Sequence, residues 1–287
     1  MTIGFIGGSG IYESLPLSNT REEEVTTPYG EPSAPVTIGE FGDTGKEVAF
    51  LPRHGSDHGR SPTNLPYRAN IYAFKKLGVT HIFASNAVGS LKEELPPGTL
   101  VVPDQIFDRT KHRKSTFFGD GIVVHQPITE PYAPELVEHL AEAAETATDA
   151  EVQQDGTYVC IEGPQYSTRA ESEFYREQGW DVVGMTAVPE AKLAREAEIA
   201  YATVTGVTDY DVWKQDHEVT LEEVLENAAK NQEAIKRTVE EAIRTLPEDH
   251  ECAAHSALEG TINTPVEAIP EETRERVDLF VGDYLDE

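Results

Sequence analysis

Two aspartates, Asp209 and Asp211, follow the apolar run 199–208 and are separated by a single tyrosine. Side chains two residues apart on a strand point to the same face, so both carboxylates would face one side if the strand continues through them. Two carboxylates held close together raise the pKa of one of them. A protonated carboxyl can donate to a ring nitrogen, while an ionised one accepts from an amino group. The pair therefore fits recognition of a nitrogen heterocycle, and it fits equally well an acidic strand end in a very acidic protein.

An arginine and a histidine, Arg53 and His54, follow a strand-like run that ends at Pro52. In a strongly acidic chain this pair suits a phosphate or carboxylate ligand, because a guanidinium forms charge-assisted hydrogen bonds with both. A surface pair that balances nearby acids is the alternative. His54 and His58 also suggest a metal, but no carboxylate or cysteine with a familiar spacing accompanies them. We therefore predict no metal site.

Two further apolar runs end in small residues. The motif GGSG ends the first run, and its backbone N–H groups and the Ser9 hydroxyl suit an anion. A dinucleotide-binding fingerprint fits less well, because Glu13 occupies the place of its third glycine. A tight structural turn explains the glycines nearly as well. The motif SNAVGS ends another run, where Asn86 and Ala87 leave room for a flat ligand, although an ordinary strand-to-helix turn is as consistent.

Four more residues offer ligand contacts on turns that follow predicted strands. Tyr166 can stack on a base, and the neighbouring Ser167 is also a natural helix cap. Met185 offers a soft apolar surface and Thr186 a hydroxyl group. A methionine alone is more often part of the core than a ligand contact. None of these residues is diagnostic by itself.

Short apolar runs bounded by glycine and proline alternate with helical patterns, which indicates an α/β fold in a single domain. Ligands of open α/β sheets gather at the carboxyl ends of strands, so the candidate turns would converge on one crevice. The predicted strands are 2–6, 36–41, 47–52, 80–85, 99–103, 157–161, 181–185 and 199–208. The predicted helices are 67–77, 134–146, 169–178, 189–197, 221–246 and 271–285.

The clearest helix begins after Thr220, which forms a capping-box pattern with Glu223, and stops at Pro247. Its apolar positions fall largely on one face. We expect the main domain to span 1–247. The acidic extension 248–287 would then pack on this body or on a neighbouring subunit.

The net charge is −29, from 52 acidic and 23 basic residues, and acids occur through most of the chain. Such a field repels nucleic acid and anionic membranes, so neither is an expected partner. An acidic solvated surface adapted to high cytoplasmic salt, as in a halophile, explains the charge most simply. No apolar run approaches the ~20 residues that cross a bilayer, and no signal peptide is recognisable. We expect a cytoplasmic protein.

Six motifs together resemble the purine nucleoside phosphorylase and methylthioadenosine phosphorylase family. They are GGSG, RHG, SNAVGSL, EGPQYSTRAES, GMTAVPE and TDYD, in this order from Ile3 to about Leu225. The resemblance implies a central mixed, twisted β-sheet flanked by helices. It implies a pentosyltransferase in which phosphate attacks the anomeric carbon as the purine leaves. Phosphate is a co-substrate there, and no metal or organic cofactor is implied.

The resemblance also assigns roles to the candidate residues. Asp209 would hydrogen-bond and protonate the purine N7, with Asp211 supporting recognition of the six-amino group. Tyr166 and Met185 would contact the base and the ribose. The phosphate-binding residues implied by the resemblance are Ser9, Arg53, His54, Asn86, Ala87 and Thr186.

Three positions bear on substrate choice within that family. Six-oxopurine enzymes carry Glu in place of Ser167 and Asn in place of Asp209, because a carbonyl needs a donor and an amino group needs an acceptor. They also place His where this chain has Leu221. With Val224 and Leu225, Leu221 would form an apolar pocket suited to a methylthio group, although all three also fit a helix core.

Family members are trimers or multiples of trimers, so a homotrimer or a hexamer is expected. His125 would reach the five-prime end of the ligand of a neighbouring subunit. The expected reaction is reversible phosphorolysis of S-methyl-5'-thioadenosine to adenine and 5-methylthioribose 1-phosphate, in purine and methionine salvage. A broader or six-oxopurine nucleoside phosphorylase and a non-catalytic nucleoside-binding protein are the alternatives.

Overall fold

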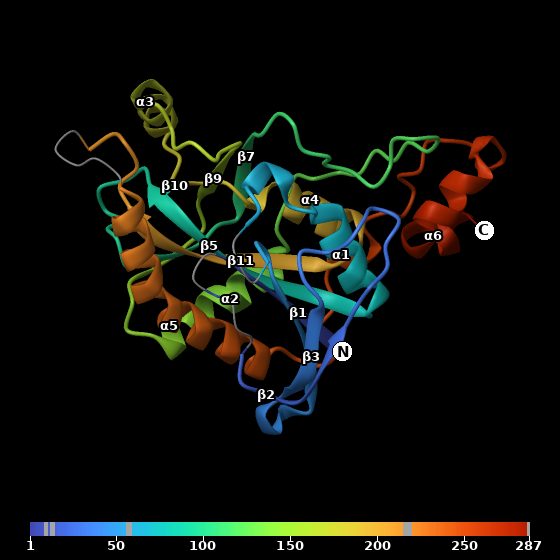
Figure 1. The fold of residues 1–287 in the computed structure, drawn as a ribbon, viewed down its shortest axis with the longest axis horizontal. Helices are drawn as coiled ribbons and strands as arrows, with labels where there is room; N and C mark the ends of the chain where they lie inside the picture. The colour runs from blue at the N-terminus through green and yellow to red at the C-terminus, as the bar shows by residue number, and fades with distance from the viewer. Residues whose placement is uncertain (9–10, 12–14, 56–58, 215–219, 286–287) are drawn as a thin grey trace.

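An 11-stranded mixed sheet runs through the centre of the molecule, with helices on both of its faces (Figure 1). The structure is a computed structural model that describes residues 1–8, 11, 15–55, 59–214 and 220–285. The strand order is β2-β3-β4-β1-β5-β10-β9-β7, and β11 pairs with β5 and with β6, which pairs with β8. This arrangement confirms the predicted α/β fold with a mixed sheet.

The boundaries of the elements are as follows. The strands are β1 (Thr2–Gly7), β2 (Leu17–Glu23), β3 (Val36–Phe41), β4 (Lys46–Pro52), β5 (Val79–Ser90), β6 (Leu100–Val102), β7 (Gln105–Arg109), β8 (Val152–Gln154), β9 (Thr157–Ile161), β10 (Val182–Gly184) and β11 (Ala200–Asp209). The α-helices are α1 (Tyr67–Lys76), α2 (Pro134–Ala147), α3 (Arg169–Glu177), α4 (Ala187–Glu196), α5 (Leu221–Thr245) and α6 (Glu271–Leu285). The short 3-10 helices are η1 (Gly42–Thr44), η2 (Pro62–Asn64), η3 (Ala253–Ser256) and η4 (Val266–Ala268).

Each strand and helix predicted from the sequence has a counterpart, but three strands escaped prediction. β2 has the sequence LSNTREE and is largely exposed, so it lacks the apolar residues that mark a strand. β8 has only three residues, two of them exposed glutamines. β7 lies at the end of the strand order and is only partly covered. Edge strands owe their conformation to backbone pairing with a neighbour, which leaves little trace in residue type.

The prediction that an apolar strand ends at Ser85 is wrong. β5 continues to Ser90 and changes its partner on one side as it does so. It pairs in parallel with β1 up to Ala84, and antiparallel with β10 at Gly89 and Ser90. Its other side pairs in parallel with β11 almost throughout. Among the described strands, the residues of β5 between Ala84 and Gly89 therefore have one uncovered edge.

The helices cover the two faces of the sheet in pairs. α2 and α5 pack against each other and against β11 on one face, while α1 and α4 pack together on the other (Figure 1). On α5 the buried side chains include Ile235, Val239 and Ile243, which belong to the main hydrophobic core. This is the apolar face that the sequence periodicity predicts.

The segment after α5 packs on the same body. Val277, Phe280 and Val281 of α6 belong to the main core. The ring of Phe280 stacks on that of Phe117, with centroids 4.2 Å apart, and meets Tyr72 of α1 edge-on. Among the described residues, no helix combines the length and the apolar character that crossing a membrane requires.

The carboxyl end of α5 is held by a lysine from the start of β4. The Lys46 ammonium is buried and donates to the carbonyl oxygens of Ile243, Arg244 and Leu246 at 2.7, 3.0 and 2.5 Å. The last carbonyls of a helix have no intrahelical partner and carry partial negative charge. Lys46 therefore joins the sheet to the helix that contributes one wall of the cavity described below.

We expect Lys46→Met to lower the free energy of unfolding by about 1–3 kcal/mol, because buried carbonyls lose their donor. Urea denaturation followed by circular dichroism measures the change. Lys230→Met is the matched control, since Lys230 lies on the exposed side of the same helix. Equal stabilities of the two variants would contradict this role of Lys46.

Candidate active site

One cavity of about 320 Å³ opens where β4, β5, β10 and β11 end and where α5 begins. The uncovered edge of β5 forms part of its wall, since Asn86 to Gly89 line it. The structure brings all but two of the candidate residues around this cavity. Those lining it are Arg53, His54, Asn86, Ala87, Tyr166, Ser167, Met185, Thr186, Asp209, Asp211, Leu221, Val224 and Leu225.

The two remaining candidates are Ser9 and His125. Ser9 lies outside the described residues, as do His58 and His217. His125 does not line the cavity of its own chain. Its backbone N–H donates to the carbonyl of Thr261, which places it beside the carboxyl-terminal segment.

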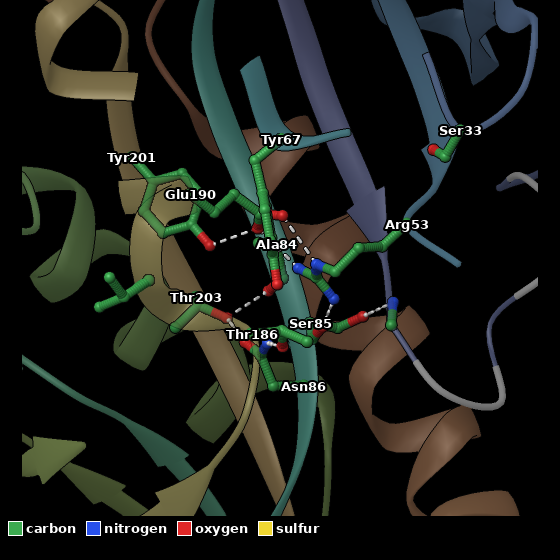
Figure 2. A network of polar contacts seen from close by, with 12 residues as sticks. Ser33, Arg53, Tyr67, Ala84, Ser85, Asn86, Thr186, Glu190, Tyr201 and Thr203 are labelled. Atoms are coloured by element: carbon green, nitrogen blue, oxygen red, sulfur yellow. Dashed lines mark hydrogen bonds and ion pairs between the residues drawn. The ribbon is translucent and has the colours of Figure 1, made fainter. Parts of the chain in front are cut away.

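A chain of short hydrogen bonds fixes the polar groups at one end of the cavity (Figure 2). The amide nitrogen of Asn86 donates to the Thr186 hydroxyl at 2.5 Å. The amide oxygen of Asn86 accepts from the Thr203 hydroxyl, also at 2.5 Å. Thr203 lies on β11 and Thr186 directly precedes α4. These bonds orient the Asn86 amide. As a result, polar groups from β5, from β11 and from the residue before α4 meet at one point.

Arg53 is buried in the wall beside this group, and its guanidinium faces a carboxylate. Its Nε and Nη2 donate to the two carboxylate oxygens of Glu190, both at 2.7 Å, and its Nη1 donates to the carbonyl of Ser85 at 2.7 Å. Burial alone would lower the pKa of Arg53, but the charge of Glu190 and its hydrogen bonds, together with smaller contributions from Tyr201 and Tyr67, outweigh this effect and raise the pKa. The surface-pair alternative for Arg53 is therefore wrong, because neither partner reaches solvent.

Sequence reasoning missed Glu190, although it stands four residues after Thr186. Its neighbour in space, Tyr201, donates from its hydroxyl to Glu190 Oε1 at 2.7 Å. The available sequence signal for Glu190 was an acidic residue that follows the candidate anion-binding residue Thr186 by four positions.

His54, next to Arg53, is buried and its Nδ1 lies 3.2 Å from the carbonyl oxygen of Arg60.

The aspartate pair lies at the other end of the cavity, but not on one continuous strand. β11 ends at Asp209, and Asp211 adopts a left-handed backbone with φ of 50°. The strand therefore does not continue through the pair, so the condition under which both side chains would face one side of a strand is not met. A turn instead brings the Asp211 N–H to Asp209 Oδ1 at 2.7 Å, while the Thr208 hydroxyl donates to Asp209 Oδ2 at 2.7 Å. A Cβ on Gly89 would lie 2.8 Å from Asp209 Oδ1, so a larger residue there would have to displace this carboxylate.

Asp211 is buried beside two serine hydroxyls. Its Oδ2, the Ser167 hydroxyl and the Ser172 hydroxyl are all buried, and none of them forms a hydrogen bond of good geometry among the described residues, although both hydroxyls lie close enough to stabilise the carboxylate. Burial raises the pKa of Asp211 to about 6, and the charge of Asp209 adds to the shift, which the nearby hydroxyls oppose. Buried polar atoms without partners are uncommon. This corner is therefore suited to a ligand that both donates and accepts.

Leu221 and Leu225 line the cavity from α5 and remain 64% and 50% exposed. The helix-core alternative is therefore wrong for these two residues, whereas Val224 is half-buried. Tyr166 is exposed at the cavity. The cavity-lining residues that sequence reasoning did not single out are Pro62, Val88, Gly89, Ile161, Pro164, Val183, Gly184, Thr208 and Ala228. They are mostly apolar or small and carry no distinctive sequence signal.

Known proteins resemble this chain over nearly its full length. Residues 2–244 match the family model of the phosphorylase superfamily. An S-methyl-5'-thioadenosine phosphorylase of Koribacter versatilis is 48% identical, with 99% of this chain and 97% of the relative covered. One of Nitrosopumilus maritimus is 50% identical over 90% of this chain and 96% of the relative.

Solved structures agree with these relatives. A methylthioadenosine phosphorylase from an Antarctic soil metagenomic library has a TM-score of 0.91 and 47% identity, covering 97% of this chain and 98% of its own. The methylthioadenosine phosphorylase of Schistosoma mansoni in complex with adenine has a TM-score of 0.79 and 37% identity, covering 85% and 91%. With this sheet, this cavity and these relatives, the chain belongs to the phosphorylase superfamily, in the family of the S-methyl-5'-thioadenosine phosphorylases.

Proposed function

We propose that this protein catalyses the reversible phosphorolysis of S-methyl-5'-thioadenosine to adenine and 5-methylthioribose 1-phosphate. One observation carries the proposal: a single cavity has hydroxyl and amide donors at one end and two carboxylates at the other. Asp209 pairs with Gly89, three residues beyond Asn86 on β5. Three residues of strand span about 10 Å. A nucleoside fits between the two ends, with phosphate on one side of the ribose and the base on the other.

At the donor end, phosphate would be bound by Arg53, His54, Asn86, the main chain of Ala87, and Thr186, together with Ser9. Asn86 and Thr186 are held in place by the hydrogen bonds described above. Phosphate so placed attacks the anomeric carbon as the bond to the purine breaks. It also stabilises the positive charge that develops on the ribose in an oxocarbenium-like transition state.

At the carboxylate end, the departing purine gains negative charge that must be neutralised at N7. We assign this task to Asp209 in its protonated form, and the hydrogen bonds from the Thr208 hydroxyl and the Asp211 N–H support the assignment because they fix the orientation of its carboxyl group. A positioned acid of this kind contributes typically ~10²–10⁴ in rate. Asp211, when ionised, accepts from the six-amino group, with Ser167 beside it. The reaction takes phosphate as co-substrate and involves no metal or organic cofactor.

The five-prime group would lie against α5. Leu221 and Leu225 expose apolar surface there, and Val224 lies between them in sequence. A methylthio group gains from this contact, whereas a hydroxyl would lose hydrogen bonds to water. This wall favours S-methyl-5'-thioadenosine over adenosine. We therefore propose a role for the enzyme in purine and methionine salvage.

We further propose that the protein works as a homotrimer or as a dimer of trimers. The exposed Leu221 and Leu225 support this proposal, because apolar side chains at a cavity mouth gain from cover by a neighbouring subunit. His125 would come from that neighbour to the five-prime group. The acidic surface suits a cytoplasm of high salt, so the assays below use molar potassium chloride.

The first test of the proposed function concerns the reaction itself. Incubation with S-methyl-5'-thioadenosine should release adenine only when phosphate is present, because phosphate is the nucleophile. Chromatography of the bases released from S-methyl-5'-thioadenosine, adenosine, inosine and guanosine measures both reaction and substrate. Adenine release without phosphate would refute phosphorolysis, and faster release of hypoxanthine would refute the substrate assignment.

Asp209→Asn provides the matched variant in the same assay. Its amide no longer protonates N7, so turnover of the adenine nucleosides should fall by about 10²-fold or more. Inosine turnover should fall less, since six-oxopurine enzymes of the family carry Asn at this position and its amide donates a hydrogen bond that their bases can accept. Equal losses for both substrates would contradict the proposed contact with the base.

A second prediction concerns pH. Asp211 has a pKa of about 6 and must be ionised to accept from the six-amino group. The KM for S-methyl-5'-thioadenosine at saturating phosphate should therefore rise as the pH falls through 6, being about tenfold higher at pH 5 than at pH 8. Steady-state kinetics over this range measure it. Asp211→Asn should flatten the profile, and a flat profile in the unmodified enzyme would contradict the assignment.

A third prediction concerns assembly. Analytical ultracentrifugation should give three or six times the mass of one chain, and a monomer with full activity would refute the proposal. His125→Ala should preserve the assembly and raise the KM for S-methyl-5'-thioadenosine, with the KM for phosphate unchanged. Because His125 does not line the cavity of its own chain, an effect on this KM requires a contribution from a neighbouring subunit.

A further inference from the structure

The carboxylate of Glu190 and the guanidinium of Arg53 form a pair that is almost completely buried, with 1% and 0% of the two side chains exposed. Two parallel hydrogen bonds of 2.7 Å join them, and Tyr201 adds a third to the same carboxylate (Figure 2). Bidentate contact between these planar groups fixes the guanidinium in orientation as well as in position. Glu190 does not line the cavity, whereas Arg53 does.

The guanidinium held by Glu190 in turn binds β5 and lies close to the end of β1. Its Nη1 donates to the carbonyl of Ser85 on β5. The Ser85 hydroxyl accepts from the N–H of Gly8, which directly follows β1, at 3.0 Å. A Cβ on Gly8 would lie 2.2 Å from the Ser85 carbonyl oxygen and 3.0 Å from Arg53 Nη1. The end of β1 therefore lies directly against the guanidinium.

Glu190 is also connected to the donor end of the cavity, through the segment that contains Thr186. Glu190 stands four residues after Thr186, in the segment that runs from Thr186 into α4. Thr186 accepts from Asn86, and Asn86 directly follows Ser85 on β5. The contacts thus close a ring through Arg53, Ser85, Asn86, Thr186 and Glu190. Breaking the ion pair would release the donors on both sides of the proposed phosphate position.

We propose that Glu190, supported by the Tyr201 hydroxyl, is a positioning residue that sets the geometry of the phosphate-binding end by orienting Arg53. This inference rests on the proposed function, since it presumes that phosphate binds at this end. Glu190 also offsets the positive charge of Arg53. Arg53 then contributes directed hydrogen bonds more than net charge to the binding of an anion.

Glu190→Gln tests the proposal, because the amide keeps the shape of the side chain but has one acceptor oxygen instead of two. We expect the KM for phosphate to rise about tenfold or more and the KM for S-methyl-5'-thioadenosine to change less than about twofold. A role in folding alone would lower the melting temperature and leave both KM values as they are. The rise of the melting temperature on adding phosphate, which reports binding directly, should shrink in the variant.

If Glu190→Gln does not fold, a pair of variants that disturbs the structure less tests the positioning role of Glu190 instead. Tyr201→Phe removes one hydrogen bond to Glu190 and should raise the KM for phosphate about threefold. Tyr132→Phe is the matched control. Its ring stacks on Tyr201 with centroids 5.9 Å apart, and its buried hydroxyl has no hydrogen-bond partner among the described residues. Tyr132→Phe should leave that KM unchanged.

The outcomes separate this inference from the function on which it rests. An unmodified enzyme that releases adenine without phosphate overturns the proposed function. Phosphate-dependent release in the unmodified enzyme, with the same KM for phosphate in Tyr201→Phe and Tyr132→Phe, overturns the positioning role alone. A rise in the KM for phosphate in Tyr201→Phe only, without a matching rise for the nucleoside, supports it.

Discussion

β5 pairs with β1 through Ala84 and with β10 only from Gly89 onward, while β11 stays beside it for most of its length. Since β1 and β10 run in opposite directions relative to β5, they cannot form one continuous neighbour. The strand edge between them is left to side chains and, in the proposed function, to ligand. Both ends of the cavity depend on this change of partner, because Asn86 lies within the uncovered stretch and Gly89 faces Asp209.

A chain with a net charge of −29 must bind an anion against its own field. The Arg53–Glu190 pair brings no net charge, and Asn86, Thr186 and Thr203 are neutral. Long-range attraction to these groups is therefore weak, and directed hydrogen bonds at short range carry the proposed binding. Salt screens distant charges over roughly 3 Å at 1 M, whereas contacts inside a buried wall are screened much less. Such a site is compatible with the high-salt interpretation of the acidic surface.

Prediction from the sequence succeeded where residue type alone carries the signal. The amphipathic α5, the glycine-bounded strands and the collinear motifs placed most cavity residues correctly in one crevice. Prediction from the sequence failed where the role of a residue depends on another residue that lies far away in the chain or is reached by an unexpected turn. Asp211 reaches Asp209 through a left-handed turn, and Glu190 matters only because Arg53 lies opposite. β5 extends beyond Ser85 because β11 pairs with it as far as Gly89 and β10 pairs with its last two residues. Such relations between distant segments leave no periodic pattern in one chain.

The corner around Asp211 shows how base selection can arise from unfilled hydrogen bonds. Asp211 is buried with the hydroxyls of Ser167 and Ser172 beside it, and these hydroxyls only partly offset the effect of burial on its carboxylate. A buried polar atom that a ligand leaves unsatisfied costs about 1–3 kcal/mol relative to a satisfied one. In the proposed function, a base with an amino group at this corner supplies a donor to the ionised Asp211. A base with a carbonyl there would place oxygen against oxygen, adding repulsion to the unsatisfied group. The enzyme would then reject a six-oxopurine because this base leaves buried polar atoms without hydrogen bonds. Such a penalty is larger than the one that a small difference in shape produces.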